Sequence, residues 1–186
     1  MLGAAGYFGL AFAAAMIAVA LGAFFRDPPR HSDSPPNCVL SPADGRVVAV
    51  SSDASGVDIA IFLSVFNVHV TRAPIDGALI EWERIVGGYA MAFRGAASHN
   101  ARHRVVLTTE RGKVELSLIA GAVARRVVPF VFPPSSLRRG QRIALIKFGS
   151  RAELRLPPGH AAVVSVGDRV RAGETILAEA SASEAP

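Results

Sequence analysis

The first 25 residues constrain this chain more than any other feature, because they contain no charged side chain. The run MLGAAGYFGLAFAAAMIAVALGAFF is long enough to cross the roughly 30 Å hydrocarbon core of a bilayer as one helix. A cleaved secretory signal would begin with basic residues, and this segment does not. Instead Arg26 and Arg30 follow it, which by the positive-inside rule leaves the rest of the chain in the cytoplasm. We therefore expect residues 1–25 to be a retained anchor in the inner or plasma membrane.

The composition indicates a folded domain that favours anionic partners. Hydrophobic residues make up 51% of the chain and charged residues 19%, which excludes a disordered protein. The net charge of +5 comes almost entirely from arginine and suits phosphate groups or an acidic membrane surface. No helix-turn-helix, zinc-finger or RNP pattern is present, so nucleic acid is not an expected partner. Cys38 is the only cysteine; it fits a reducing compartment and is expected to be a small buried residue.

A proline-rich segment divides the chain. Residues 26–36 combine four prolines with small polar residues, which predicts an extended linker. Residues 37–186 then form one domain, for which short apolar or alternating runs and glycine turns predict strands. The fold class expected is mainly β, a sandwich or barrel-sandwich, preceded by one hydrophobic membrane helix. The clearest strands are 45–51, 57–70, 78–85, 104–109, 113–120, 142–147 and 152–156, with a hairpin at 110–112.

Three side chains could together activate a hydroxyl group. Asp44 lies in an Asp-Gly turn, His69 lies near the end of the long apolar run, and Ser150 follows Gly149 between two strands. A carboxylate can orient an imidazole, which then takes the proton of an attacking serine, as in serine hydrolases. The GxSxG turn of α/β-hydrolases is absent. Each residue also has a simpler interpretation, as a turn aspartate, a core histidine and a strand kink.

Two other patterns point to weaker alternatives. His99 and His103 are four residues apart, but their segment is not convincingly helical and no acidic or cysteine ligand accompanies them, so no metal is expected. The segment 165–174 resembles the turns of biotinyl and lipoyl carrier domains, which would make the chain a membrane-tethered carrier module. Such carriers need a lysine at a hairpin tip, and neither Lys113 nor Lys147 stands in one.

A set of motifs taken in order resembles one family over essentially the whole chain. Each motif alone is weak, and the order and spacing make the set specific. The motifs are FFRDPPR (24–30), SPADG (41–45), FNVHVTRAPIDG (66–77), NAR (100–102), IAGAVARR (119–126) and FGSR (148–151). They resemble the phosphatidylserine decarboxylases of the short bacterial and archaeal type.

The resemblance implies that the chain cuts itself between Gly149 and Ser150. The Ser150 hydroxyl would attack the Gly149 carbonyl, and β-elimination would then leave a pyruvoyl group on residue 150. A β chain of residues 1–149 and an α chain of residues 150–186 would result. Glycine leaves the carbonyl unhindered, and serine supplies an oxygen that can both attack and leave. The family pattern points to His69 paired with Asp44 as the base.

The resemblance also implies the reaction and the partners. The covalent pyruvoyl group would be the cofactor, with no metal, and would form a Schiff base with the amine of phosphatidylserine in the membrane. Loss of CO₂ and protonation by His69 would give phosphatidylethanolamine. The two cleaved chains would stay together as a heterodimer, and a homodimer of these is possible in the family.

Some positions depart from the family pattern. Arg72 stands at the apparent place of a second histidine, and Arg151 follows Ser150 where many members have threonine. The Asn-Glu-Arg of relatives is Asn100-Ala101-Arg102 here, so any role of that glutamate is absent. We expect Arg72, Asn100 and Arg102 to help bind the phosphate or carboxylate of the substrate.

Overall fold

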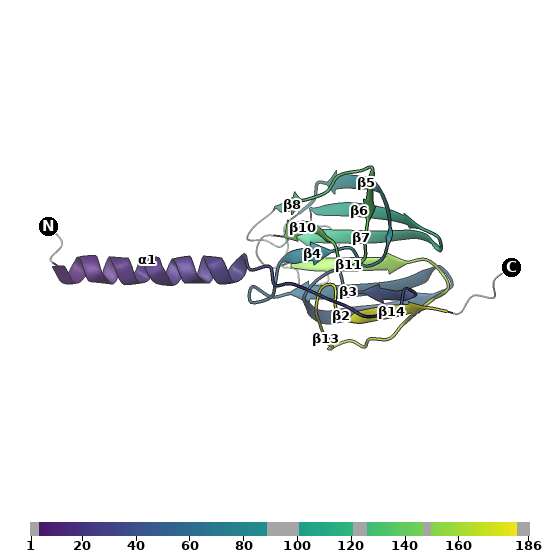
Figure 1. Ribbon diagram of the computed structural model, residues 1–186, viewed down its shortest axis with the longest axis horizontal. Helices are drawn as coiled ribbons and strands as arrows, with labels where there is room; N and C mark the ends of the chain where they lie inside the picture. The colour runs from purple at the N-terminus through teal and green to yellow at the C-terminus, as the bar shows by residue number, and fades with distance from the viewer. Residues whose placement is uncertain (1–3, 89–100, 121–125, 147–149, 182–186) are drawn as a thin grey trace.

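The computed structural model describes residues 4–88, 101–120, 126–146 and 150–181 of the chain (Figure 1). One helix, α1 (Ala4–Phe24), projects from one end of a domain built of strands. The prediction of a mainly β fold preceded by one apolar helix is confirmed.

Helix α1 has the length and composition of a membrane-crossing segment. Its 21 residues correspond to about 31 Å at 1.5 Å per residue. The stretch Tyr7–Phe24 has a mean hydropathy of 2.1, and of its side chains only Phe24 is buried. Apolar side chains therefore face outward all round the helix, which suits a lipid environment better than water.

The strands pair in antiparallel fashion in three sheets. The largest sheet has the order β13-β2-β3-β11-β7-β6-β5-β9, and the smaller ones have the orders β4-β10-β8 and β1-β14-β12. The strands are β1 (Cys38–Leu40), β2 (Gly45–Asp53), β3 (Gly56–Leu63), β4 (Val70–Arg72), β5 (Gly77–Ile85), β6 (Arg102–Thr109), β7 (Gly112–Ala120), β8 (Val127–Pro129), β9 (Ser135–Leu137), β10 (Arg142–Ile146), β11 (Ser150–Leu156), β12 (His160–Ala162), β13 (Arg169–Val170) and β14 (Ile176–Ala180).

The large sheet has an inner and an outer face, which the pattern of β11 defines. Ser150, Ala152, Leu154 and Leu156 alternate with exposed or half-buried polar residues, as the two-residue period of a strand requires. The inner face packs into one apolar core with residues of the smaller sheets, among them Ile143, Ile146, Leu177 and Ala178. Cys38 is buried, as expected.

The two ends of the large sheet differ, and we call them the anchor end and the far end. At the anchor end β3 finishes and β11 begins, beside the base of α1 (Figure 1). At the far end Gly56 and Gly112 begin β3 and β7 with positive φ values of 133° and 117°. A Cβ at Gly56 would lie 2.0 Å from the Leu156 carbonyl oxygen, so only glycine fits there. The predicted hairpin of 104–109 and 113–120 is confirmed as β6 and β7.

The predicted strand 57–70 is wrong, because a turn divides it into β3 and β4. The Asn67 amide donates to the Ser64 carbonyl at 3.0 Å, and the Asn67 side-chain oxygen accepts from the Ser64 amide at 2.8 Å and hydroxyl at 2.7 Å. The apolar pattern hid this turn because its tip is Val65 and Phe66, which are 50% and 83% exposed. His69 consequently lies between two strands rather than inside one.

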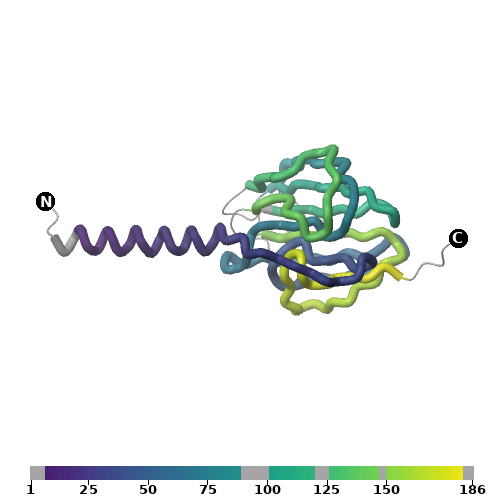
Figure 2. The backbone as a smooth tube through the Cα atoms, viewed as in Figure 1, coloured from purple at the N-terminus to yellow at the C-terminus, as the bar shows by residue number. Residues whose placement is uncertain are grey.

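Residues 26–36, here called the strap, are extended as predicted but are fastened to the domain. Figure 2 shows them running from the helix along the side of the strands. Asp27 forms ion pairs with Arg72 at 2.7 Å and Arg142 at 2.8 Å. Arg30 pairs with Asp44 at 2.9 Å and with Glu174 at 3.0 Å. The strap is thus a fixed part of the structure next to α1.

Candidate active site

Ser150 is the first residue of β11 and lies on the inner face at the anchor end. It stands between Leu63 of β3 and Ala120 of β7. Its hydroxyl is fully buried and has no hydrogen-bond partner within the described structure. Such a group costs about 1–3 kcal/mol to leave unsatisfied, so its presence suggests a chemical role. Gly149 lies outside the described residues.

His69 is held close to the segment that leads into Ser150. Its carbonyl oxygen accepts a hydrogen bond of 3.0 Å from the amide of Ile146, the last residue of β10. Ser150 is four positions further along, so its Cα lies within about 14 Å of that of Ile146. The fold therefore brings two residues far apart in the sequence to one end of the domain.

The contacts of the His69 ring define its tautomer. Nδ1 lies 2.9 Å from the carbonyl oxygen of Asn67. Because a carbonyl can only accept, Nδ1 carries the hydrogen and the lone pair is on Nε2. Nε2 is buried and has no hydrogen-bond partner among the described residues. This nitrogen is the atom of the site that is available to take a proton.

The last residue of α1 covers this histidine. The rings of Phe24 and His69 have centroids 4.2 Å apart and are tilted by 31°. Burial lowers the pKa of His69, and the positive charge of Arg26 lowers it further. The Asn67 carbonyl and the charge of Asp44 oppose this effect but do not outweigh it. The imidazole is therefore neutral at pH 7, as a general base must be.

Asp44 does not form a hydrogen bond with His69, contrary to the pairing that the family pattern suggested. Its oxygens accept from Arg30 Nη2 at 2.9 and 3.2 Å and from the Ala172 amide at 2.8 Å. The Asn67 carbonyl oxygen, rather than a carboxylate, accepts the hydrogen bond from His69 Nδ1. Asp44 acts on His69 through its charge alone.

The turn that carries Asp44 depends on small residues. The Ser41 hydroxyl donates to the Ala43 carbonyl at 2.6 Å, which fixes the turn. A Cβ at Gly45 would lie 2.2 Å from the Phe62 carbonyl oxygen, so glycine allows β2 to begin close against the end of β3. The Asp-Gly pair therefore serves both the turn and the approach of Asp44 to the anchor end.

The three residues expected to bind substrate have different surroundings. The Arg72 guanidinium is buried and bonds Asp27 at 2.7 Å, the Gly140 carbonyl at 3.0 Å and the Pro28 carbonyl at 3.2 Å. The contacts with Asp27 and Pro28 hold the strap, and a substrate would have to displace one of the three. Arg102 begins β6 at the anchor end, opposite Ile119. Asn100 lies outside the described residues.

Sequence reasoning gave no role in the active site to Phe24, Arg30 and Asn67, although all three contact His69 or Asp44. Only Asn67 carried a signal, since an asparagine inside an apolar run favours a turn. The contacts of Phe24 and Arg30 join residues far apart in the chain, and no local pattern indicates them.

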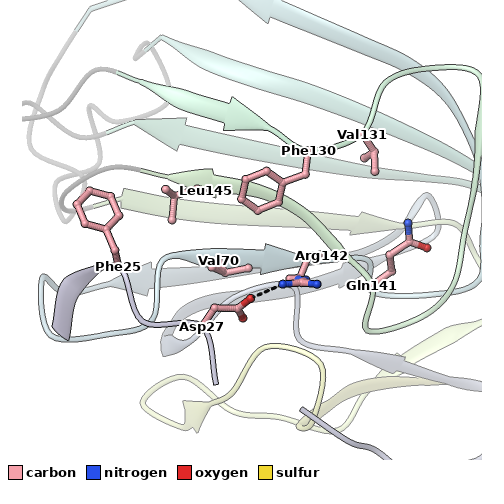
Figure 3. A pocket seen from close by; sticks show the side chains of 8 residues that line it. All are labelled: Phe25, Asp27, Val70, Phe130, Val131, Gln141, Arg142 and Leu145. Atoms are coloured by element: carbon pink, nitrogen blue, oxygen red, sulfur yellow. Dashed lines mark hydrogen bonds and ion pairs between the residues drawn. The ribbon is translucent and has the colours of Figure 1, made fainter. Parts of the chain in front are cut away.

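An apolar groove of about 500 Å³ opens at the base of the helix. Figure 3 shows Phe25, Phe130 and Leu145 along it, with the ion pair of Asp27 and Arg142 at one side. Val70, Val131 and Gln141 complete its lining. Since Val70 follows His69 in the chain, the groove adjoins the segment that carries the histidine.

Within the described residues, no three His, Cys, Asp or Glu side chains are placed to hold a metal ion. His103 Nδ1 accepts a hydrogen bond of 2.9 Å from the Trp82 indole. His99, the other half of the metal pattern considered from the sequence, lies outside the described residues.

Comparison with known proteins gives one consistent result. The sequence model of the family described as phosphatidylserine decarboxylase matches residues 18–178, a range that includes Asp44, His69 and Ser150. A protein of Burkholderia multivorans named phosphatidylserine decarboxylase proenzyme is 42% identical over 187 residues, covering 96% of this chain and 87% of that protein. Proteins of the same name from Burkholderia mallei and Burkholderia pseudomallei are 43% identical with the same coverage.

Proposed function

This chain belongs to the phosphatidylserine decarboxylase family, and we propose that it converts phosphatidylserine to phosphatidylethanolamine with a pyruvoyl group made by its own cleavage at Gly149–Ser150. The relatives are named proenzymes, so the enzyme is a self-processing one. The observation that carries the proposal is the pair of unpartnered buried atoms, Ser150 Oγ and His69 Nε2, at the anchor end of the domain.

The proposed cleavage uses these two atoms. Ser150 Oγ attacks the Gly149 carbonyl carbon while His69 Nε2 takes the hydroxyl proton. The peptide C–N bond breaks, and the proton passes to the freed amine of Ser150. Loss of the Ser150 α-proton then breaks the Cβ–O bond and releases residues 1–149 as a carboxylate. Addition of water and loss of ammonia leave the pyruvoyl group on residue 150.

The surroundings of Ser150 fit a pyruvoyl group. The residue is fully buried with no hydrogen bond to its Oγ, so loss of the hydroxyl costs the folded protein no side-chain hydrogen bond. Once formed, the pyruvoyl carbonyl supplies an electron-accepting group that lets CO₂ leave an attached amino acid. His69 then holds the proton that the substrate carbon needs after CO₂ has left. The neutral state of His69, which its lowered pKa favours, suits removal of the proton from Ser150. The charge of Asp44 supports the protonated state that is needed after CO₂ has left.

The sheet gives a reason for the two cleaved chains to stay together as a heterodimer. After the cut, β11 would still pair with β3 on one side and with β7 on the other. In addition, β13 pairs with β2, and β14 pairs with β1. The shorter chain would therefore remain bonded to the longer one in two sheets. A homodimer of this unit stays a prediction from the resemblance.

The substrate reaches the site from the membrane in this proposal. The apolar groove at the base of α1 suits an acyl chain, and it adjoins the segment of His69. The basic residues Arg26 and Arg30 directly after the helix support a cytoplasmic domain on the inner or plasma membrane. Arg102, at the anchor end, is our candidate for a contact with the substrate head group, together with Asn100 and Arg72.

An intact-mass measurement of the purified full chain tests the proposal. We expect two chains divided between residues 149 and 150, the shorter one beginning with a pyruvoyl group in place of an amine. Borohydride should reduce that group, add the corresponding mass and abolish activity. Fully active enzyme of uncut mass would overturn the proposal and favour a serine hydrolase or a carrier module, since neither requires the cut.

A further inference from the structure

Two arginines stand side by side at the anchor end, away from Ser150. Arg46 of β2 and Arg169 of β13 are directly opposite each other in the antiparallel pair. Like charges in this position destabilise a sheet. The arrangement therefore calls for a negatively charged group that neither strand provides.

Other arginines of the outer face have acidic partners. Arg104 pairs with Glu81 and Glu115, both at 2.9 Å, and Arg155 pairs with Asp58 at 3.3 Å. In contrast, neither Arg46 nor Arg169 has an ion pair or a side-chain hydrogen bond in the described part of the chain. Both side chains are exposed to solvent, so these two charges are available to a ligand.

The two arginines line a pocket of about 500 Å³ that is equipped for an anion. Arg171, Ser64 and Asn67 also line it. The pocket includes Asp44, but that carboxylate is already bonded to Arg30. Arg171 approaches Glu174 only at 3.8 Å and is largely exposed. The charge left without a partner in this pocket is therefore positive.

The pocket lies next to the base of α1. One wall is the turn 64–67, whose tip residues Val65 and Phe66 are exposed apolar side chains. Arg26, two residues after the end of α1, donates to the Phe66 carbonyl at 2.6 Å. The turn is thus fastened to the base of the helix (Figures 1 and 2). In a bilayer crossed by α1, the lipid head groups would begin near this level.

The pocket opens on the face of the sheet opposite to Ser150. Arg46 is aligned with Phe62, and Phe62 with Arg151, so these residues share the outer face. Ser150 is aligned with Leu63 on the inner face. A group bound by Arg46 therefore lies on the other face of the sheet from the Ser150 side chain.

We propose that Arg46 and Arg169 bind the phosphate of an anionic phospholipid of the surrounding bilayer. Two guanidinium groups offer planar pairs of N–H donors that match phosphate oxygens. The lipid neutralises the cross-strand repulsion and fixes the domain against the membrane surface. This inference rests on the membrane location in the proposed function but does not depend on the cleavage or the decarboxylation.

The test uses the full chain in neutral detergent with phosphatidylglycerol, which has no amine and cannot be a substrate. Native mass spectrometry should show one retained phosphatidylglycerol and no retained phosphatidylcholine. Arg46→Gln and Arg169→Gln should each weaken retention at least tenfold, whereas Arg155→Gln, a paired arginine of the same face, should leave it unchanged. Ser150→Ala protein, which cannot be processed in our proposal, should bind as the wild type does, so failure of the reaction and of this site are separable.

Folding is checked by thermal unfolding without anionic lipid. Removing one of two like charges should leave the melting temperature equal or higher. Phosphatidylglycerol should raise it in the wild type but not in the Arg46→Gln and Arg169→Gln variants. Equal lipid retention by the wild type and both glutamine variants would overturn the proposal. Displacement of the lipid by millimolar inorganic phosphate would also overturn it, because the site would then be one for free phosphate.

Discussion

The two ends of the large sheet are built from the same strands but differ in how their polar and charged groups are partnered. At the far end, Arg155 has its acidic partner Asp58, and glycines with positive φ make the close approaches. At the anchor end, Ser150 Oγ and His69 Nε2 are buried without partners, and Arg46 faces Arg169. Beside the far end one such atom also occurs, His160 Nε2, directly after the loop that follows β11. Among the described residues the anchor end gathers two unpartnered atoms and a pair of like charges, which suits a site for a reaction or a ligand.

This difference shows how one sheet can support both a reactive site and a stable fold. A buried hydroxyl without a partner costs about 1–3 kcal/mol, and a continuous apolar core must offset that cost. The core beneath β3, β7 and β11 is fully buried along most of its length. Substitutions at the two ends should therefore separate chemistry from stability.

The largest effect is expected for Ser150→Ala. Without its hydroxyl the chain cannot form the ester, so cleavage and decarboxylase activity should both fall to background. The melting temperature should not decrease, since the lost oxygen had no hydrogen bond. Gel electrophoresis and calorimetry on the purified variant would check both statements. A cut variant would show that the nucleophile is another residue.

His69→Ala should have the next largest effect. Removal of a general base typically slows a reaction by about 10²–10⁴-fold, so the precursor should accumulate and mature slowly. His103→Gln is the matched control, because that histidine bonds Trp82 and lies on β6. The rate of cleavage of freshly translated precursor measures the effect. Equal rates for the two variants would exclude His69 as the base.

Gly56→Ala should change stability without changing the chemistry. The new Cβ would lie 2.0 Å from the Leu156 carbonyl at a φ of 133°, which should cost more than about 1 kcal/mol. The fraction that folds should be cut at the normal rate, because Gly56 is at the far end. Chemical denaturation gives the first quantity and a cleavage time course the second. A slower cut in the folded fraction would show that the two ends are coupled.

The smallest effect concerns pH. Burial holds the pKa of His69 below its ordinary value, which is about 6.5 in an unfolded chain. The unfolded state therefore binds more protons below pH 6.5, so the contribution of His69 is fully present above about pH 6.5. It is lost as the pH falls from there through the lowered folded pKa. Replacement by glutamine should flatten this part of the stability profile.

The control for this profile must address His103, whose pKa burial also lowers. His103→Gln should remove the separate contribution of His103 to the slope of stability against pH. Denaturation midpoints between pH 7 and pH 5 would compare the two variants. An unchanged slope in the His69 variant would mean that folding does not shift the pKa of this histidine.

The sequence was sufficient for features that depend on local pattern. The helix of 21 residues, the hairpin of β6 and β7 and the extended strap all follow from composition and periodicity. The turn at 64–67 was missed because its tip is apolar. A hydrogen bond from the Ser64 amide to the side-chain oxygen of Asn67 outweighs the strand preference of the run. Hydrophobic periodicity detects burial, and Val65 and Phe66 are apolar without being buried.

The sequence also indicated Asp44, His69 and Ser150, but not how they are held. Arg30 takes the carboxylate that was expected to orient the imidazole, and a backbone carbonyl replaces it. These exchanges depend on where the strap crosses the domain. Such a crossing is a tertiary property, which neither spacing nor residue type determines.

The ring of Phe24 connects α1 to the active site. This residue ends α1 and also lies against the histidine, with ring centroids 4.2 Å apart. A helix of fixed length adapts to a thicker or thinner bilayer by tilting or shifting. Any such adjustment of α1 would move the ring of Phe24 against the ring of His69. The thickness of the bilayer would then affect the active site.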